Sequence, residues 1–434
     1  MSEKTRTVKG MHDLLPEDLA KIEHIKSLFL ATAERYGFVR VQTPALEFAE
    51  IYRSTSEFPE ERCYSLVDGK SRKLILRSDP DAPLTRLVAS HFRLAPKPVK
   101  LAFCDSIFRS WNPRRREFRM FGINTFGIDE PTADAEILRV IADVVDEVGF
   151  PDYRVEFNNL QLFRCIIGES RTESQSLDEV GNILYAIRFA SDSESIIASL
   201  ASHHLPQSII DAILELLGCR DDEPKAYDVL ARLSGLFPSL IPELEKTLAF
   251  RTALADHGIR NAYLNVANLH GTGFYSGFMY RLFPKEGAKE IGDGGRYDHM
   301  MQQMYNEPMP VAGIGLGIER FIELMAANHC PITLPSKPRS MVVACADSAL
   351  ATHCRPILGR VRSAGLIVEE DLVNRGFDKT VRYAESKRHN RAVMIIRSGP
   401  ERNLRLKIVN LDKNCADSLV ATNLEELHGI LLGC

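Results

Sequence analysis

The sequence lacks paired cysteines and long apolar runs. Its nine cysteines are scattered over 434 residues, and no two of them form a C-x-x-C pair. This odd, dispersed set argues against a structural zinc site and a disulfide framework, and it favours a reducing compartment. No apolar run approaches the length of a membrane span, and the first residues, MSEKTRTVKG, contain no apolar signal-peptide segment. We therefore expect a cytoplasmic enzyme or adaptor without a membrane partner or a metal site built from side chains.

The sequence also has no excess of positive charge. It contains 54 Lys and Arg against 58 Asp and Glu, which gives a formal net charge of −4. A nucleic-acid-binding polycation is thereby excluded, and any such contact must come from a local patch. The apolar fraction of 45% is ordinary for a globular protein. The length predicts two or three domains, each with an ample core.

Arginine is concentrated in one short stretch, FRSWNPRRREFRMF, at residues 108–121. The apolar run at residues 98–108 and the segment 122–127 predict two strands, so the stretch forms a hairpin. Arg109 precedes the hairpin loop, and four more arginines follow it: Arg114, Arg115, Arg116 and Arg119. Guanidinium groups suit the planar capture of phosphate or carboxylate. The hairpin is either an anion site or a solvated, charged tip.

The remaining pattern predicts a mixed α/β protein in two parts. A turn-rich start leads into a helix that ends near Tyr36, and then into a strand that is stopped by Pro44. Residues 159–258 read as helix after helix before strand character resumes, which predicts a helical insertion. The glycines of residues 311–320 do not have the G-x-G-x-x-G spacing of a dinucleotide loop.

We expect a catalytic domain at residues 1–330 and a proline-containing linker at 331–340. An α/β domain of alternating strands and helices is predicted at 341–434.

Several segments together resemble the class II aminoacyl-tRNA synthetases, and within them the histidyl-tRNA synthetases. The N-terminal GMHDLLP, the helix and the strand before Pro44 resemble motif 1. Phe108-Arg109 through Arg114-x-x-x-Phe118 resembles motif 2, and GLGIERF at residues 315–321 resembles motif 3. GGRYD at residues 294–298 resembles a signature of the histidyl enzymes, and the C-terminal part resembles their anticodon-binding domain.

The resemblance implies a fold, cofactors and partners. It implies an α/β (α+β) fold, with a six- or seven-stranded antiparallel sheet flanked by helices and carrying the helical insertion. It implies ATP and Mg²⁺, an amino-acid substrate, a tRNA or another carrier as acceptor, and a homodimer.

The resemblance also assigns the ATP side of the site. Arg109 would hold the α-phosphate and the substrate carboxylate, Arg320 the γ-phosphate, and Phe118 would stack on adenine. Arg114 and Glu319 complete the predicted ATP contacts. Because such catalysis is mostly positioning and electrostatic stabilisation, fixed guanidinium groups suffice for it.

The predicted amino-acid pocket departs from the family pattern. The family usually reads Arg-Pro-Glu-Gly-Thr where residues 77–81 read Arg-Ser-Asp-Pro-Asp, so Asp79 has a shorter reach and Asp81 adds a second carboxylate. A glutamine expected to hold the α-amine falls on Met120, and an acidic residue expected to grip the imidazole falls on Asn124. These changes favour a ligand with extra positive or donor character over ordinary histidine. The other predicted substrate contacts are Tyr275, Tyr297 and Gly295.

A further departure replaces an arginine. The family's Arg-Gly-Leu-Asp-Tyr-Tyr strip appears here as His-Gly-Thr-Gly-Phe-Tyr at residues 270–275. Its arginine assists at the α-phosphate, whereas a neutral imidazole supplies no fixed charge. We nevertheless count His270 with Arg109 and Arg320 as a catalytic candidate. Trp111, where motif 2 usually has glutamate, either stacks on a base or packs.

Three functions remain open. The first is a ligase that activates an amino acid, which need not be histidine, and transfers it to tRNA or another acceptor. The second is a non-catalytic regulator resembling the regulatory subunit of ATP phosphoribosyltransferase. The third is an RNA-binding sensor. The retained pair Arg109 and Arg320 favours the ligase.

Overall fold

The computed structural model describes residues 5–53, 62–150, 152–169, 177–189, 193–287, 289–336, 338–398 and 403–433. The chain divides into two compact units, Met1–Leu334 and Pro335–Cys434. Each unit has its own hydrophobic core. Among the described residues, no helix is both long and apolar enough to span a bilayer.

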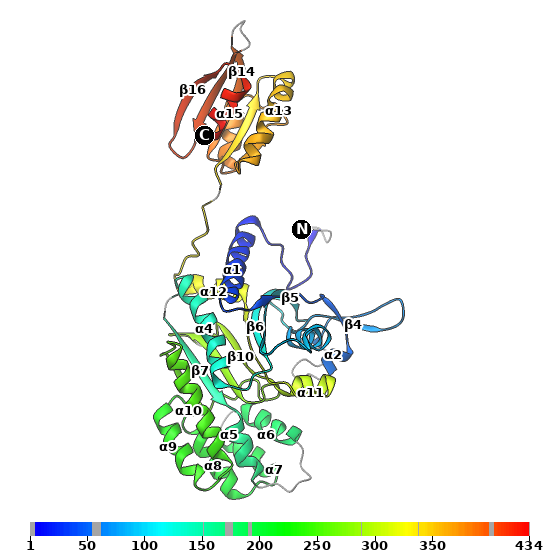
Figure 1. Cartoon of the computed structure of the whole chain (residues 1–434), viewed down its shortest axis with the longest axis vertical. Coiled ribbons are helices and arrows are strands. Elements are labelled where there is room, and N and C mark those ends of the chain that lie inside the picture. The colour runs from blue at the N-terminus through cyan, green and yellow to red at the C-terminus, as the bar shows by residue number, and fades with distance from the viewer. Residues whose placement is uncertain are drawn as a thin grey trace. The chain divides into compact units, whose positions relative to one another are not determined.

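The first unit is built on a sheet of eight strands in the order β1-β5-β6-β11-β10-β9-β7-β8 (Figure 1). The six central strands are antiparallel, whereas β1 and β8 pair in parallel at the edges. The strands in sheet order are β1 Val39–Arg40, β5 Val99–Phe108, β6 Glu117–Phe126, β11 Val311–Gly317, β10 Gly292–Arg296, β9 Phe278–Pro284, β7 Tyr153–Asn159 and β8 Ala262–Leu264.

This sheet confirms the predicted fold class and corrects the strand number. We expected six or seven antiparallel strands, and the central six match that expectation. The two additional strands are only two and three residues long. Such short segments show no periodicity from which a strand can be predicted.

Three helices cover one face of this sheet: α1 Pro16–Arg35, α4 Pro131–Glu147 and α12 Ile318–Ala327. Phe29 of α1 stacks on Phe121 of β6, with ring centroids 4.4 Å apart. Gly37 follows α1 with φ +80°, a backbone conformation that glycine adopts without strain. The predicted C-terminal end of this helix is therefore correct.

Smaller elements lie next to the arginine hairpin. A three-stranded sheet consists of β2 Leu46–Phe48, β4 Lys73–Leu76 and β3 Ser65–Val67, and it delivers the chain into α3 Asp81–Leu87. A π-helical segment, Val88–Phe92, continues α3. The remaining short helices are α2 Glu50–Arg53 and α11 His299–Tyr305.

The described residues form six helices in sequence between β7 and β8. Figure 1 shows them gathered at one end of the first unit. Phe250 joins them to the sheet, since its ring packs against Phe157 of β7 and Phe278 of β9. The helices are α5 Gln161–Gly168, α6 Leu177–Phe189, α7 Ser193–Ser202, α8 Gln207–Leu217, α9 Glu223–Ser234 and α10 Leu240–Asp256.

The second unit is a five-stranded sheet in the order β13-β12-β14-β15-β16. The last strand, β16, was not predicted, because it is exposed along most of its length and has no buried apolar face. The strands are β12 Ser340–Cys345, β13 Ile367–Glu370, β14 Arg391–Ser398, β15 Asn403–Asn410 and β16 Cys415–Ala421. The helices are α13 Ser348–Ser363, α14 Phe377–Ser386 and α15 Leu424–Gly433.

Candidate active site

A cavity of about 720 Å³ opens on the first unit beside strands β6, β10 and β11. It joins the arginine hairpin, the loop that precedes α3 and the strip that follows β8. Most of the predicted site residues line it, although they come from segments far apart in the sequence. Those that line the cavity are Asp79, Asp81, Arg109, Arg114, Phe118, Met120, His270, Tyr275, Tyr297 and Arg320.

The β5–β6 hairpin fixes Arg109 between two aromatic rings. Its guanidinium carbon lies 5.2 Å from the centroid of Phe118 and 5.7 Å from that of Trp111. Its Nε donates to the carbonyl oxygen of Ser78 at 3.4 Å. A cation over ring faces gains electrostatic stabilisation, and here the rings also limit the rotamers of the side chain. Trp111 therefore both packs on Arg109 and lines the cavity.

Arg320 lines the cavity from the first turn of α12. Its side chain is 44% exposed, and Nη1 donates to Glu290 Oε1 at 2.8 Å. Glu290 also pairs with Arg281, so two guanidinium groups converge on one carboxylate. A charged ligand that enters the cavity can thus recruit Arg320 by replacing an exposed ion pair, which contributes little stability.

Glu319, a predicted ATP contact, does not line the cavity. Its carboxylate is buried and accepts from the backbone nitrogen of Arg119 at 2.9 Å and from Arg119 Nη1 at 3.0 Å. The pair connects the start of α12 to strand β6. The structure therefore gives Glu319 a role in holding the hairpin. The charge of Arg119 is already paired with Glu319, so it is less available to an anionic ligand.

The loop before α3 is anchored by a buried arginine. Arg77 donates to Asp105 at 2.9 Å and to the carbonyl oxygen of Thr43 at 2.7 Å, and its side chain is 3% exposed. Two residues later, Asp79 Oδ1 accepts the backbone N–H of Asp81 at 2.8 Å. These bonds place both aspartates at the cavity with defined side-chain directions.

Burial raises the pKa of Asp79 to about 6, although the nearby charge of Arg109 opposes this effect. A second carboxylate, Asp293 of β10, adds to the rise in the pKa of Asp79. For Asp293 itself burial would raise the pKa, but hydrogen bonds from His270 and Tyr275 and the charge of Arg109 bring it below the usual range. The two carboxylates consequently differ in how readily they ionise near neutral pH.

Asp293 lines the cavity and was not predicted from the sequence. It lies in IGDGGRYD, one residue before the glycine pair. The signal for it was a lone carboxylate in a glycine-rich strand, where small neighbours leave space for a ligand. Asp79, Asp81 and Asp293 together give one side of the cavity an acidic character.

Asn124 lies behind the cavity wall. It is 2% exposed, and its Nδ2 donates to Asp81 Oδ1 at 3.2 Å and to the hydroxyl of Tyr297. The hydroxyl of Tyr297 also donates to Asp81 Oδ1, at 3.1 Å. Asn124 thus acts on the cavity through Asp81 and Tyr297, whereas the sequence predicted direct contact with substrate.

Gly295, the third predicted residue outside the lining, is a packing position. A Cβ built on it would lie 2.5 Å from the carbonyl oxygen of Phe278 and 2.7 Å from Cδ1 of Tyr275. No other residue fits there without moving strand β9 or the Tyr275 ring. Gly295 therefore helps to place Tyr275.

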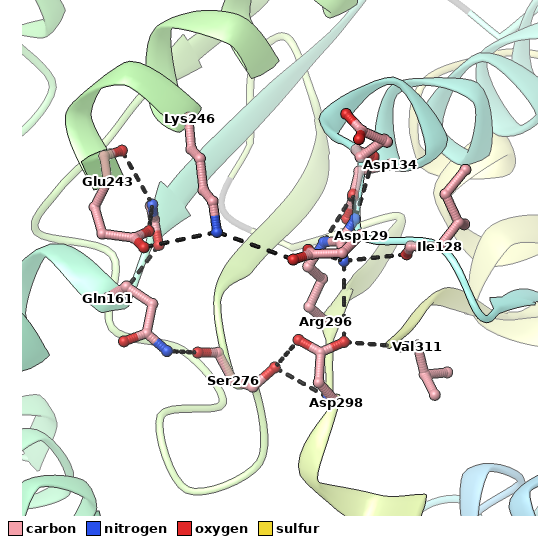
Figure 2. A network of polar contacts seen from close by, with 12 residues as sticks. Ile128, Asp129, Asp134, Gln161, Glu243, Lys246, Ser276, Arg296, Asp298 and Val311 are labelled. Carbon is pink, nitrogen blue, oxygen red and sulfur yellow. Dashed lines mark hydrogen bonds and ion pairs between the residues drawn. The ribbon is translucent and has the colours of Figure 1, made fainter. Parts of the chain in front are cut away.

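The two chain neighbours of Tyr297 belong to the network of polar contacts in Figure 2, and Arg296 is the first of them. Arg296 turns away from the cavity, and its Nε and Nη2 donate to Asp134 Oδ2 at 2.9 and 2.6 Å. Its Nη1 donates to Asp129 Oδ1 at 2.8 Å. Both aspartates belong to the start of α4 and the loop before it, so β10 is tied to the helix layer.

Asp298, the residue after Tyr297, belongs to the same network (Figure 2). Its Oδ1 accepts the backbone N–H of Val311 at 2.7 Å, and its Oδ2 accepts the hydroxyl of Ser276 at 2.8 Å. Ser276 follows Tyr275 in the chain. The network consequently fixes both tyrosines that form the cavity wall.

His270 is located where the strip after β8 meets helix α6. Its Nε2 lies 3.4 Å from Asp293 Oδ2, and its Nδ1 lies 3.0 Å from Nη2 of Arg188. Tyr275 also donates to Asp293 Oδ2, at 3.1 Å. Arg188 belongs to the helical segment and was not predicted, because nothing in an amphipathic helix marks one arginine as a neighbour of a distant loop.

The chain is similar in sequence to curated proteins. A curated histidine–tRNA ligase from Methanocaldococcus jannaschii is 26% identical over 399 residues, covering 89% of this chain and 91% of that protein. One from Pyrococcus abyssi is 28% identical over 390 residues, covering 87% and 88%.

Solved structures share the fold. The histidyl-tRNA synthetase of Nostoc sp. PCC 7120 superposes with a TM-score of 0.75 at 20% identity, over 98% of each chain. A protein from Bacillus halodurans C, described as an ATP phosphoribosyltransferase regulatory subunit/histidyl-tRNA synthetase, gives the same TM-score at 17% identity. That match covers 92% of this chain and 100% of the other.

The family model for histidyl-tRNA synthetase matches residues 10–321, well over half of the sequence. The chain therefore belongs to the histidyl-tRNA synthetase family.

Proposed function

We propose that this protein is an ATP-dependent ligase that activates an amino acid as its adenylate and passes it to tRNA or another carrier. One observation carries the proposal: Arg109, Phe118, Arg320 and the carboxylate-bearing Asp79 all line a single cavity. Cationic side chains suit the phosphates of ATP, an aromatic ring suits adenine, and a carboxylate suits an ammonium group. The curated relatives named histidine–tRNA ligase support this assignment.

The main contribution of the protein to this reaction is to hold charged side chains in fixed positions. A carboxylate oxygen of the amino acid attacks the α-phosphorus of ATP, the bond to the β-phosphate oxygen breaks, and pyrophosphate leaves with the electron pair. Negative charge builds on the α-phosphate, where the fixed guanidinium of Arg109 stabilises it without reorganisation. Arg320 holds the far end of the triphosphate, which keeps the leaving group in line with the attacking oxygen.

Magnesium would be held chiefly by ATP. The described residues contain no group of three or more His, Cys, Asp or Glu side chains able to hold a metal ion. A Mg²⁺ ion commonly keeps several waters and binds phosphates with one or two carboxylates. Glu290, which lines the cavity beside Arg320, is the carboxylate that fits this role, and Mg²⁺ would neutralise phosphate charge there.

The acidic side of the cavity favours an amino acid with a second cationic group over histidine. An α-ammonium needs one carboxylate, whereas Asp79, Asp81 and Asp293 supply three. Asp81 is directed by Tyr297 and Asn124, so it is positioned as an acceptor. The thioether of Met120 is only a weak acceptor. A diamine-bearing amino acid or a modified amino acid meets this charge better than a neutral imidazole.

Amino-acid-dependent exchange of pyrophosphate into ATP tests the function. The panel comprises L-histidine, L-lysine, L-ornithine and L-2,4-diaminobutyrate with the other standard amino acids. We expect a diamino acid to give the fastest exchange. Fastest exchange with micromolar histidine would show that the specificity proposal is wrong. No exchange with any amino acid, by protein that still binds ATP, would instead support a regulatory or sensor function.

Replacing Arg320 with Ala should weaken ATP binding by about 1.5–3 kcal/mol, the range for losing a charge-assisted hydrogen bond. Calorimetric titration of ATP into the variant gives this number directly. Arg93→Ala is the control, because that arginine is exposed, pairs with Glu307 and lies outside the cavity lining. Equal ATP affinity in the two variants would contradict the assignment of Arg320 and favour the regulatory function.

The raised pKa of Asp79 predicts that substrate binding depends on pH. Only the ionised form attracts an ammonium, so the affinity for L-lysine should increase roughly tenfold between about pH 5 and pH 7. For folding the sign is opposite: the pKa of Asp79 is raised from 3.8 to about 6 in the folded state, so its contribution to stability is present below the lower value and is lost as pH rises to the higher one. Asp79→Asn should give a flat binding profile. A profile unchanged by that substitution would assign the titration to another group.

We also propose a homodimer formed through the three-stranded sheet. Phe48 of β2 and Leu66 of β3 lie on either side of Leu74 of β4, and they are 44% and 45% exposed. The next residue, Val67, is 71% exposed but points to the opposite face of the strand. Apolar side chains that gather on one surface mark an interaction site more often than isolated ones do. This sheet follows the helix and strand that resemble motif 1, so a second copy of the chain is the expected partner.

Sedimentation should therefore show a dimer at micromolar concentration, and Leu66→Asp should shift it toward monomer because the aspartate would bury an unpaired charge. Leu419→Asp, at an exposed position on strand β16, is the control and should leave the dimer intact. A monomeric wild-type protein would exclude this interface.

A further inference from the structure

Helix α6, which lies between strands β7 and β8 in sequence, contributes a charged residue to the active site. Nη2 of Arg188 lies 3.0 Å from Nδ1 of His270, and His270 lines the cavity. These residues are separated by 82 positions in the chain. The contact therefore results from how the helices pack on the strip that follows β8.

This contact defines which nitrogen of His270 carries the proton. Arginine has only donors, so a hydrogen bond from Arg188 requires a lone pair on Nδ1. A neutral imidazole with a free Nδ1 has its proton on Nε2. A doubly protonated ring would direct an N–H at the guanidinium, and the two positive groups would repel each other. Of the two neutral tautomers, the contact with Arg188 thus selects the one with the proton on Nε2.

The selected tautomer directs a donor at Asp293. Nε2 of His270 lies 3.4 Å from Oδ2 of Asp293, and the Tyr275 hydroxyl donates to the same oxygen at 3.1 Å. The Tyr275 hydrogen bond and the His270 contact meet at one oxygen and together limit the orientation of the Asp293 carboxylate at the cavity surface. A neighbouring fixed charge also polarises the imidazole and strengthens its donor.

We propose that Arg188 is a positioning residue for the amino-acid substrate: it holds His270 in the Nε2–H form and thereby orients Asp293 to receive the substrate's second cationic group. This inference rests on the proposed function for its substrate, but the state of the histidine ring is independent of it. Arg188 acts through His270 and does not itself touch the substrate.

Two variants separate this role from simple packing. Arg188→Met keeps much of the side-chain volume but donates nothing, whereas Arg188→Lys retains a cationic donor. The exchange assay uses L-lysine, L-ornithine and L-2,4-diaminobutyrate, and the one that reacts fastest serves as the probe. In Arg188→Met its KM should rise about tenfold or more, as for loss of a hydrogen bond to a charged group. The KM for ATP should stay unchanged, and Arg188→Lys should recover most of the loss.

A second readout needs no substrate. Nitrogen NMR of the full-length protein labelled with ¹⁵N-histidine distinguishes the two neutral tautomers, and a His270→Gln sample identifies the His270 signals among the twelve histidines. The wild type should show only the Nε2–H form once the ring is neutral, and Arg188→Met should show a mixture. An Nδ1–H ring in the wild type, or an identical spectrum in Arg188→Met, would overturn the inference.

The two proposals fail in different ways. If no amino acid supports exchange, the ligase proposal fails while the NMR experiment still decides whether Arg188 holds His270. If exchange proceeds and Arg188→Met changes neither the KM of the probe nor the tautomer, the inference about Arg188 fails alone. The double substitution Arg188→Met/His270→Gln adds a check: Arg188 should matter much less once the imidazole is gone.

Discussion

Replacing Arg109 with Met should slow amino-acid-dependent pyrophosphate exchange by about a hundredfold to a thousandfold, the usual loss when a preorganised donor to a developing oxyanion is removed. The structure gives a specific reason. The guanidinium is packed between Trp111 and Phe118 and anchored on the Ser78 carbonyl, so its position is set before ATP arrives. Single-turnover measurements at saturating ATP separate this rate effect from weaker binding.

The matched control for Arg109 lies on the same hairpin. Arg116 does not line the cavity, and its Nη1 lies 3.4 Å from the Tyr64 hydroxyl. Arg116→Met removes one guanidinium from the same charged loop and should leave the exchange rate within a few-fold of the wild type. Equal losses in both variants would mean that the overall charge of the hairpin matters, and that Arg109 has no special position.

Arg109 lies in a part of the site that local sequence patterns describe well. The hairpin is a local structure, and the alternation of side chains along its two strands places Arg109 and Phe118 on the same surface. The register agrees, since Phe108 pairs with Glu117 and Ile107 with Phe118. Turn and strand signals within about 20 residues predicted the hairpin, whereas the resemblance to motif 2 gave Arg109 and Phe118 their expected roles.

Arg188 and Asp293 could not be found by such reasoning. Arg188 contacts His270 only because α6 packs near the strip that contains His270. Asp293 faces the cavity because β10 lies between β9 and β11, an order that no local pattern reveals. Glu319 was predicted as an ATP contact because a family motif identifies its position in the sequence. Only the packing shows that its carboxylate accepts hydrogen bonds from Arg119.

Replacing Arg296 with Met should destabilise the first unit by about 3–5 kcal/mol, the usual cost of breaking a buried ion pair by removing one partner. Asp134 is fully buried, and both Nε and Nη2 of Arg296 donate to its Oδ2. Asp134 Oδ1 has no donor among the described residues, so the carboxylate depends on the two bonds that Arg296 makes to Oδ2. Urea unfolding at pH 7.5, a value chosen within roughly the usual range of maximal stability, measures this loss.

The double substitution Arg296→Met/Asp134→Leu is the control for this prediction, because it removes both charges and leaves none buried alone. It should recover a large part of the stability, since replacing a whole buried pair by apolar groups is far less costly than breaking it. Destabilisation equal to that of the single variant would show that the lost bonds to Asp129 and to the carbonyl oxygens before α4 account for the effect.

The pH dependence of the Arg296→Met variant tests the same mechanism from another side. Burial raises the pKa of Asp134 to about 6, even though Arg296 lowers it. Without Arg296 the pKa of Asp134 must rise further, so the variant holds a proton on Asp134 at pH values where the wild type has released it.

Below about pH 6 both proteins contain the neutral acid and differ only by the lost hydrogen bonds. Above that value the wild type ionises Asp134 against a partner, whereas the variant must keep the proton or bury a bare charge. The stability difference between the two proteins should therefore widen as pH rises from about 5 to 8. A constant difference over that range would mean that Asp134 does not carry its charge in the folded protein.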